Sequence, residues 1–242
     1  MDNRLTSKVY SEDILWETME AFDGIASSYR RRPWGIIYSV LNENTMVVGD
    51  IGCGPGHNII AVLREYKRVR GIALDYSYNM VYRAYRRSVS EGLGYRMLAI
   101  QCDMRRLPFR DNVFDALLYI ASIHHVPLRM QRRSVLKEAY RVLVRGGVLL
   151  VTVWARYQLY FLPVLVKNIV ARLRGSIESI GDIVRPWKTR DRVYNRYYHL
   201  YSLRELVEDI LDTGFKLVDK GIYYPKRSLL KPFKNYYVIA LK

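Results

Sequence analysis

The sequence has little cysteine and no long apolar run, and these two shortages exclude whole classes of protein. Its 242 residues include two cysteines, Cys53 and Cys102, so we expect no disulfide framework and interpret both thiols as reduced and intracellular. The most hydrophobic stretch, residues 157–170, is broken by Pro163 and Lys167 and is shorter than the roughly 20 residues of a membrane-spanning helix. No apolar signal region follows the N-terminus. We therefore expect a cytoplasmic protein with no membrane association.

Acidic residues are also in short supply, because 23 aspartates and glutamates stand against 39 lysines and arginines, a formal net charge of +16. A surface this basic favours a polyanionic partner, most simply a nucleic acid. A general preference for arginine in the host would give the same excess, so the charge leaves both explanations open. Half of the residues are apolar, which is enough for one globular α/β domain with a sizeable core.

One glycine-rich motif stands out. An apolar run, Val47–Ile51, contains Asp50 and leads into Gly52, Gly54 and Gly56. The pattern predicts a buried strand followed by a tight turn into a helix. Glycine allows positive φ angles and leaves no Cβ between the main chain and a ligand. A strand, a glycine loop and a helix at the carboxyl end of a sheet form a ligand-binding crevice.

The spacing of the glycines separates two classes of ligand. The dinucleotide fingerprint G-x-G-x-x-G/A fails, because His57 or Ile59 occupies its last position. The spacing G-x-G-x-G, with Asp50 two residues before the first glycine, resembles the first motif of class I S-adenosylmethionine (SAM) methyltransferases. An ordinary strand-to-helix turn could use the same glycines, so the rest of the chain has to decide.

Predicted strands and helices alternate along most of the chain. Strands are expected at 47–51, 69–74, 95–101, 113–120 and 148–154, and in succession at 215–223 and 236–241. Helices are expected at 11–28, 34–41, 58–66, 80–87, 128–143 and 202–212, with Arg145-Gly146-Gly147 as the C-terminal turn of the fifth. The predicted fold class is α/β: a single Rossmann-like class I methyltransferase domain over residues 1–242. It would have a mostly parallel seven-stranded sheet, helices on both faces and a C-terminal antiparallel hairpin.

Residues at the later strand ends complete a predicted cofactor site. Asp75 follows the second strand, about 20 residues after the glycine loop, where a carboxylate accepts hydrogen bonds from both ribose hydroxyls. Asp103 follows the third strand, where a carboxylate can accept from the adenine amine while Met104 flanks the ring. Ala121, directly after the fourth strand, is assigned to the same site.

Residues 155–199 interrupt the alternation. They are basic and aromatic and include an apolar helix candidate at 157–172. We interpret them as an insertion that lies over the crevice and forms much of the substrate site. A packing excursion without a functional role is the alternative.

Four groups of short motifs together resemble one family. They are Asp23-Gly24-Ile25-Ala26 with Arg30-Arg31-Arg32-Pro33-Trp34; Leu107-Pro108-Phe109 with Phe114-Asp115 and Ile123-His124-His125; Arg132-Arg133 with Arg141-Val142-Leu143-Val144-Arg145-Gly146-Gly147 and Val153-Trp154-Ala155; and Pro186-Trp187 with Arg196-Tyr197-Tyr198-His199-Leu200-Tyr201. Over nearly its whole length the chain resembles the tRNA methyltransferases that esterify the wobble base 5-carboxymethyluridine, at position 34. The second and third groups are shared with many SAM methyltransferases, whereas the fourth is much more specific. The segment between Ala26 and Pro33 is shorter than in the family.

The resemblance implies SAM as the cofactor, tRNA as the substrate and a small zinc-finger activator protein as the partner in a heterodimer. No dioxygenase or RNA-recognition domain accompanies the motifs, so the expected unit is the methyltransferase alone. We expect no metal site within the chain itself.

Esterification of a carboxylate determines which residues the reaction needs. The acceptor is ionised at neutral pH, since its pKa lies near 4, so the site needs orientation more than a strong base. Arg30 is the candidate clamp for the carboxylate, with the carboxylate of SAM or solvent as its alternative partners. His124 is the candidate donor to the carboxylate or the uracil, with a buried structural role as its alternative. His125 is expected to be structural, because successive side chains at a strand end point opposite ways.

Aromatic side chains can stack on a flipped-out base, and arginine can contact phosphate. The candidate substrate-binding residues are Trp34, Arg196, Tyr197, Tyr198 and His199. Packing at a sheet edge is the alternative for the aromatic ones. Basic residues within 185–196 and 226–234 are expected to follow the phosphate backbone.

Two other functions remain open. A SAM methyltransferase for a quinone or lipid would share the core motifs, and the apolar residues 157–170 would then form a lid over a hydrophobic substrate. An inactive SAM-fold subunit that serves as an RNA-binding scaffold is the third possibility. The presence of Asp50, Asp75 and Asp103 argues against that scaffold, because all three expected cofactor carboxylates are retained.

Overall fold

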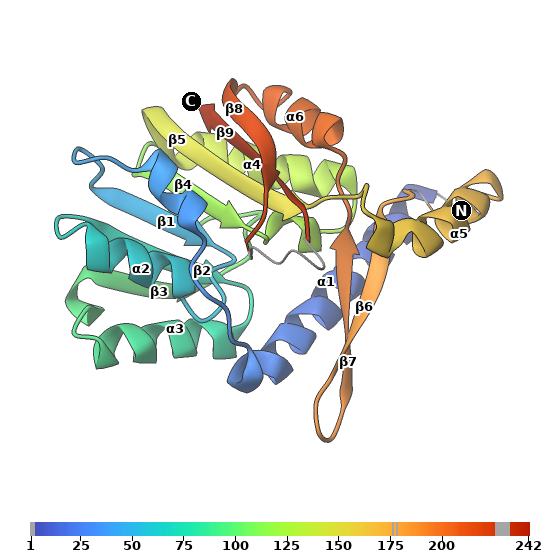
Figure 1. Ribbon diagram of the computed structural model, residues 1–242, viewed down its shortest axis with the longest axis horizontal. Helices are drawn as coiled ribbons and strands as arrows, with labels where there is room; N and C mark the ends of the chain where they lie inside the picture. The colour runs from blue at the N-terminus through green and yellow to red at the C-terminus, as the bar shows by residue number, and fades with distance from the viewer. Residues whose placement is uncertain (1–2, 176, 178, 226–232) are drawn as a thin grey trace.

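The predicted strands come together in one sheet (Figure 1). The computed structural model describes residues 3–175, 177, 179–225 and 233–242. The strand order is β3-β2-β1-β4-β5-β9-β8, and every neighbouring pair is parallel except those of β9, which is antiparallel to β5 and β8. The strands are β1 (Val47–Ile51), β2 (Arg70–Asp75), β3 (Met97–Gln101), β4 (Phe114–Ile120), β5 (Leu143–Trp154), β8 (Lys216–Tyr223) and β9 (Asn235–Leu241). The predicted fold class, including the C-terminal antiparallel hairpin, is confirmed.

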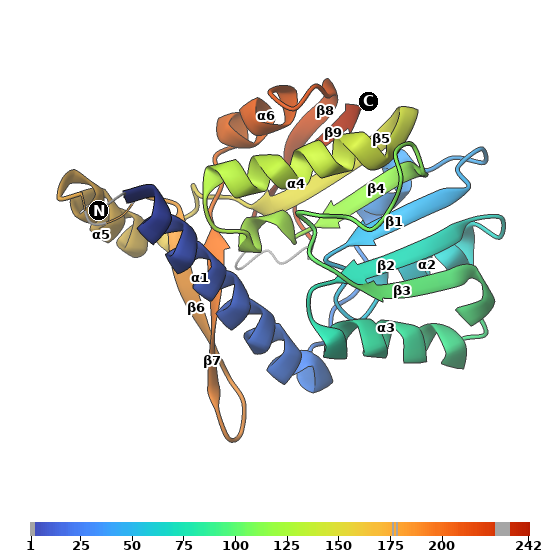
Figure 2. The ribbon, with the colours of Figure 1, turned by 180° about the vertical axis from the view of Figure 1, so that it is seen from behind.

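Helices cover both faces of the sheet because each central strand alternates its apolar side chains between the two (Figures 1 and 2). In β4, Leu117 and Tyr119 belong to the apolar cluster under α4 and α6. Ala116 and Leu118 belong to the cluster that includes α2 and, through Ala84, α3. These helices are α2 (His57–Glu65), α3 (Tyr78–Ser90), α4 (Arg129–Val142) and α6 (Leu203–Leu211).

The predicted starts of two strands, β5 and β3, are wrong. The expected glycine turn does not cap α4, because the chain becomes extended earlier: Leu143 already pairs with Phe114 of β4. Gly146, with φ +76°, therefore lies inside β5 next to a register shift. The segment Gly94–Arg96 forms a 3-10 turn, so β3 begins at Met97 and not at 95. The helix expected at 34–41 is present as the 3-10 helix η2 (Gly35–Val40).

A long N-terminal helix, α1 (Asn3–Ile25), begins before the predicted residue 11 and crosses the carboxyl ends of the strands (Figures 1 and 2). Its last turn is tied to the start of α3. The Asp23 carboxylate accepts hydrogen bonds from the Ser77 hydroxyl at 2.7 Å and from the Asn79 N–H at 2.8 Å. These bonds fix where the following loop, which carries the three consecutive arginines, leaves the helix.

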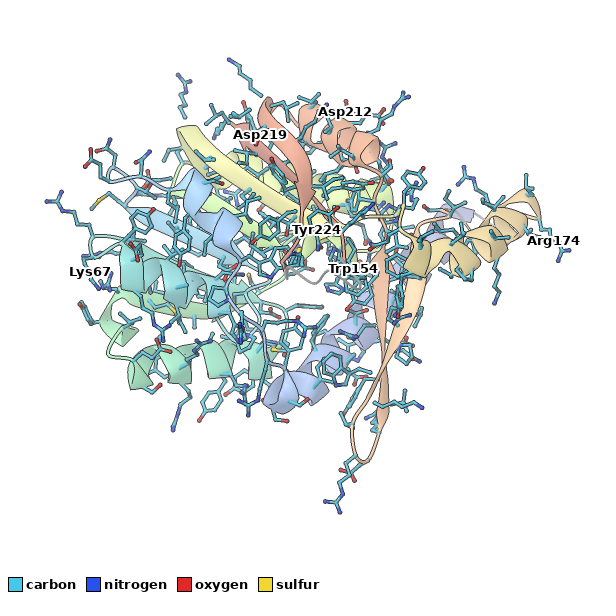
Figure 3. All side chains as sticks on the ribbon, viewed as in Figure 1. Lys67, Trp154, Arg174, Asp212, Asp219 and Tyr224 are labelled. Atoms are coloured by element: carbon cyan, nitrogen blue, oxygen red, sulfur yellow. The ribbon has the colours of Figure 1, made fainter. Side chains whose placement is uncertain are left out.

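Residues 155–199 form a helix and a hairpin outside the main sheet. Their elements are η5 (Leu159–Phe161), α5 (Leu162–Leu173), β6 (Asp182–Lys188) and β7 (Val193–His199). The helix was predicted; the antiparallel β6–β7 hairpin was not. The hairpin projects beyond the sheet beside α1 (Figure 1), and the outer end of α5, at Arg174, lies far from the sheet (Figure 3). In the parts of the chain that the structure describes, no helix has both the length and the hydrophobicity of a membrane span.

A buried group of charges, here called the anchor network, holds the base of the hairpin against α6. It consists of His199, Asp182, Glu205 and Arg156. The His199 ring nitrogens lie 2.6 Å from Asp182 Oδ1 and 2.7 Å from Glu205 Oε1, and Arg156 donates to Glu205 Oε2 at 2.5 Å. Burial alone would raise the pKa of Glu205, but His199 and Arg156 hold it at about 2. The carboxylate is therefore ionised at neutral pH and fixes β7 relative to α6.

Gly181, directly before β6, yields a prediction about this anchoring. A Cβ there would lie 2.4 Å from the carbonyl oxygen of Leu200, whose own N–H donates to the Gly181 carbonyl at 2.7 Å. Because neither backbone group can move alone, we expect Gly181→Ala to lower the free energy of unfolding by about 1–3 kcal/mol in denaturant titrations. The matched control is Gly35→Ala, where the nearest atom would be 3.6 Å away. Equal losses in the two variants would contradict the assignment.

Candidate active site

A cavity lies where the carboxyl ends of the central strands meet α1 and the hairpin. Gly52, Asp75 and Ala121 line it from the strand ends, whereas Phe22 of α1 and Tyr198 of β7 line it from the opposite side. The carboxyl edge of an open α/β sheet, at the point where the strand order reverses, is where such folds bind ligands.

The glycine loop at the end of β1 requires glycine for its backbone and for its contacts. Gly52, Gly54 and Gly56 have φ angles of +73°, +52° and +75°. A Cβ on Gly52 would lie 2.4 Å from Ser122 Cβ, and the Gly54 N–H donates to Asp75 Oδ2 at 2.8 Å. Gly52 and Gly54 line the cavity, whereas Gly56 is the N-cap residue of α2.

Asp50 lies behind this loop and not in the cavity wall. The side chain is fully buried, and its Oδ2 accepts from the Ile59 N–H of α2 at 3.3 Å. Burial raises the pKa of Asp50 to about 7. The carboxylate thus positions the start of α2 relative to β1.

Two carboxylates do line the cavity, at the ends of β2 and β3. Asp75 accepts from the Gly54 N–H through Oδ2 and from the Ser77 N–H through Oδ1, and burial raises its pKa to about 6. Asp103 is held by the Arg105 guanidinium, with a closest approach of 2.6 Å, and Met104 lines the cavity next to it.

The end of β4 has an unusual backbone. Ala121 has a φ of +53°, which is uncommon for a residue with a Cβ. Its N–H donates to the Thr152 carbonyl at 3.0 Å and to the Thr152 hydroxyl at 2.9 Å, which holds the strained turn in place. The next residue, Ser122, presents a buried hydroxyl that has no hydrogen-bond partner among the described residues.

These features fit SAM. The loop at Gly52 and Gly54 exposes main chain without Cβ atoms, and Ser122 offers a buried, unpartnered hydroxyl beside it. The carboxylates of Asp75 and Asp103 can accept from ribose hydroxyls and from an exocyclic amine. Eight cofactor-binding residues were predicted, and Asp50 and Gly56 lie outside the cavity. The other six line it, namely Gly52, Gly54, Asp75, Asp103, Met104 and Ala121.

His124 lines the same cavity as the two carboxylates, from the turn that follows β4. It is fully buried in the 3-10 turn η4 (Ile123–His125), and its Nδ1 accepts from the Trp154 N–H at 3.2 Å. Because a backbone N–H only donates, Nδ1 carries no hydrogen, and the neutral ring carries its hydrogen on Nε2. Nε2 has no partner among the described residues. Burial and the neighbouring His125 lower the pKa of His124 well below its ordinary value, so the ring is a neutral donor.

His125 also lines the cavity, so the expectation that the two histidines point opposite ways is wrong. They belong to a 3-10 turn and not to the end of a strand. The Nδ1 of His125 lies 2.8 Å from the Tyr197 carbonyl oxygen and donates to it. The ring packs edge-on against Phe22, with centroids 4.7 Å apart. Burial lowers the pKa of His125 to about 3, so this ring is neutral as well.

A stacked aromatic pair forms the wall beside His124. Tyr198 lies on Trp154 with ring centroids 4.1 Å apart and an interplanar angle of 16°. Trp154 ends β5 near the middle of the molecule (Figure 3). Trp34 lines another part of the cavity and stacks on Tyr223 of β8 at 5.4 Å. The cavity therefore offers flat apolar surfaces of the kind that accept a heterocycle.

The other predicted site residues lie outside the cavity. Arg30 is exposed in a groove beyond the cavity mouth. Arg196 is buried, with its guanidinium 4.7 Å from the Trp187 ring centre. Tyr197 donates to Asp182 at 2.7 Å, and His199 belongs to the anchor network. Strand alternation explains the division, because Tyr198 faces the cavity while its two neighbours face the interior of the hairpin base.

Several cavity residues were not among the predicted site residues, namely Arg31, Arg32, Ser122, His125 and Trp154. Arg31 and Trp154 belong to motifs that the sequence displays, but their contacts, with His57 and His124, involve residues 26 and 30 positions away. Of the basic residues expected along the RNA backbone at 226–234, positions 226–232 lie outside the described residues.

Substituting Gly52 tests the cofactor loop. Gly52→Ala places a Cβ 2.4 Å from Ser122 at a positive φ, so the loop has to shift and we expect SAM affinity to fall at least about tenfold by calorimetry. Gly92→Ala is the matched control, because it has φ +69° but no atom within 4 Å of the added Cβ. It should carry the same backbone cost and leave SAM affinity unchanged. A similar loss of affinity in both variants would rule out a specific role of the loop.

The pKa of Asp75 predicts how SAM binding depends on pH. Donors such as ribose hydroxyls bind the ionised carboxylate better than its protonated form, so affinity should rise as pH increases through about 6. We expect the Kd for SAM to fall several-fold between pH 5 and 7.5, and Asp75→Asn to flatten this dependence. Asp50 is unchanged in the Asp75→Asn variant, so the pH dependence of the Kd that remains there measures the contribution of Asp50. A pH dependence identical in both proteins would show that Asp75 does not face the cofactor.

Comparisons with known proteins agree with this site. The family described as "Methyltransferase domain" matches residues 49–151. A protein of Encephalitozoon cuniculi (strain GB-M1) whose name places it among the methyltransferases is 32% identical over 198 residues, which cover 81% of this chain and 83% of that protein. The tRNA (carboxymethyluridine(34)-5-O)-methyltransferase of Schizosaccharomyces pombe is 27% identical over 84% of this chain and 90% of its own length. The Xenopus tropicalis protein of the same name, alkbh8, is 35% identical, but the match spans 36% of its length.

A solved structure gives the same fold. A SAM-dependent methyltransferase of Methanosarcina mazei superposes with a TM-score of 0.69 and 20% identity, covering 88% of this chain and 99% of that one. The sheet order, the glycine loop, the strand-end carboxylates and a relative matched over most of its length lead to one assignment. This chain belongs to the class I SAM-dependent methyltransferases, and S-adenosylmethionine is its cofactor.

Proposed function

We propose that this methyltransferase esterifies the carboxymethyl group of a wobble uridine, position 34, in tRNA. Relatives that carry this activity in their names support the proposal, above all the S. pombe protein that the chain matches over 90% of its length. The net charge of +16 suits a polyanionic substrate. A small zinc-finger activator protein, implied by the resemblance of the motifs, is proposed as the partner.

One observation carries the proposal: the described residues of the cavity include no strong general base near His124. The carboxylates among them are Asp75 and Asp103, and both lie at the strand ends that fit the cofactor. The remaining polar lining consists mainly of neutral histidine rings and guanidinium groups, including His124, His125 and Arg31, together with hydroxyl groups and one amide. An acceptor that must lose a proton would find only a weak base in His125, because burial lowers the pKa of that ring to about 3. A carboxylate is ionised already, with a pKa near 4.

His124 has the geometry to orient such an acceptor. Its Nε2–H can donate to one carboxylate oxygen and leave the other free to attack. Because the ring is neutral, it directs the carboxylate without cancelling the charge that makes the oxygen nucleophilic. SAM, when bound, supplies an electrophilic methyl group. The protein's contribution is thus alignment and the exclusion of water from a buried site.

The aromatic walls are assigned to the uracil. Tyr198 and Trp154 present a stacked pair next to His124, and Trp34 faces the cavity from η2's side. Arg31 and Arg32 are exposed and line the cavity, whereas Arg30 does not. We assign to these two the role expected of Arg30, the electrostatic attraction of the acceptor carboxylate. Arg196, Tyr197 and His199 contribute indirectly, because they hold β7 and thereby place Tyr198.

The reaction is tested by transfer of a labelled methyl group from SAM to total tRNA from a strain that lacks this gene, with and without the zinc-finger protein. We expect a base-labile ester on 5-carboxymethyluridine, identified by nucleoside mass spectrometry, and higher activity with the partner. Labelling of a lipid or quinone extract but not of tRNA, with SAM binding intact, would refute the proposal.

Substituting His124 tests the role of its donor. We expect His124→Phe to lower kcat by about 100-fold, because the acceptor loses the buried ring donor that orients it, while the Kd for SAM stays the same. His124→Gln keeps an N–H donor and should lose less. Rapid-quench rates and thermal unfolding of both variants separate chemistry from folding. Equal rate losses in the two variants would indicate a packing role instead.

A further inference from the structure

Outside the mouth of the cavity, a second hollow runs between the loop after α1 and the exposed face of α3; we call it the basic groove. Guanidinium groups dominate its lining. The residues that matter here are Arg30, Arg31, Arg83, Arg86, Arg87 and Tyr82.

The charge of the basic groove is largely uncompensated. No carboxylate lines it among the described residues. Of its five arginines, Arg87 alone forms an ion pair within the described part of the chain, with Glu91 at 3.0 Å, and Glu91 is shared with Arg64. The Nε of Arg83 is buried and has no partner in the same part of the chain.

The positive charge of the groove also contributes to lowering the pKa of a histidine in its lining. His57 lines the basic groove, and its pKa is lowered to about 4, first by burial and then by Arg87, Arg31 and Arg83. A cluster of like charges that suppresses a neighbouring cation is unfavourable on its own and is relieved when an anion binds.

Exposed aromatic rings lie on the same helix as Arg83, Arg86 and Arg87, and one of them, Tyr82, lines the basic groove. Tyr78 and Tyr82 are 57% and 46% exposed on α3, one turn apart, and their rings stack with centroids 6.2 Å apart and an interplanar angle of 13°. Tyr85 is 48% exposed on the same helix, directly before Arg86. Guanidinium groups interleaved with exposed aromatic faces match a nucleic-acid strand, because the former contact phosphates and the latter stack on bases.

The basic groove is continuous with the active site. Tyr29, Arg31 and His57 line both the cavity and the groove. The position of Arg31 is fixed, because its N–H donates to His57 Nε2 at 3.2 Å and its guanidinium lies 4.7 Å from the Tyr29 ring centre. A nucleic-acid strand with one base in the cavity can therefore continue directly along this groove.

We propose that the basic groove binds the sugar–phosphate backbone of RNA next to the nucleotide that enters the cavity, with Tyr82 stacking on a neighbouring base. The proposal rests on the proposed function in one respect, that the substrate is RNA. The helix α3 would then have two roles: Met80 lines the cavity assigned to the cofactor, and the exposed face of the helix would hold the substrate.

The test measures binding of unmodified total tRNA by fluorescence anisotropy over a range of salt concentrations. We expect Arg83→Gln/Arg86→Gln to weaken binding about tenfold at 100 mM salt and to reduce the slope of log K against log salt by about two. Tyr82→Ala should weaken binding with an unchanged slope. The Kd for SAM should stay the same in both variants.

The matched control is Arg110→Gln/Arg145→Gln, which removes two exposed arginines near the opposite, amino ends of β4 and β5. It should leave tRNA binding unchanged. Equal losses of tRNA affinity in the groove variant and the control variant would overturn the proposal. It would also be overturned if the groove variant bound tRNA normally but lost binding to anionic vesicles. The binding assay needs no methyl transfer. If tRNA binding depends on the groove arginines but no ester forms on tRNA, the proposed function is refuted and the proposal that the groove binds RNA stands.

Discussion

The hydrogen bond from the Trp154 N–H to His124 Nδ1 is the contact on which the account of the active site depends. It joins the end of β5 to the turn after β4 and decides which ring nitrogen carries hydrogen. Burial then keeps the ring neutral, since the pKa of His124 is lowered well below its ordinary value. His124, which lines the cavity, is consequently an uncharged ring with a buried Nε2–H that has no partner among the described residues. A carboxylate acceptor requires such a donor, because it needs to be oriented and not deprotonated.

The hairpin gives the same cavity its aromatic wall, and buried charges hold the hairpin in place. Along β7, Tyr198 faces the cavity and stacks on Trp154, while Tyr197 and His199 face Asp182. The specific motif at 196–201 is thus mostly a support for one substrate-facing ring. A change in the anchor network would be expected to act on the substrate site by displacing Tyr198, without touching the cofactor.

The sequence predicted what local pattern determines. The first strand with its Asp50, the glycine spacing and the acidic residues at later strand ends are each encoded within a few neighbouring positions, and most of these residues meet in one cavity. The hairpin was missed, and the histidine pair was misjudged, because their geometry depends on distant partners. His125 bonds to the Tyr197 carbonyl, and the Tyr197 N–H donates to the Thr18 hydroxyl of α1. Likewise, no local pattern indicates that Arg30 lies in a groove with α3 while Arg31 reaches the cavity.

The tautomer of His124 can be observed directly by long-range ¹H–¹⁵N correlation NMR on protein labelled at its four histidines, with His124→Gln used for assignment. The account predicts a neutral ring with its hydrogen on Nε2 that does not titrate between pH 5 and 8. A hydrogen on Nδ1, or a titration near the ordinary pKa of about 6.5, would contradict it.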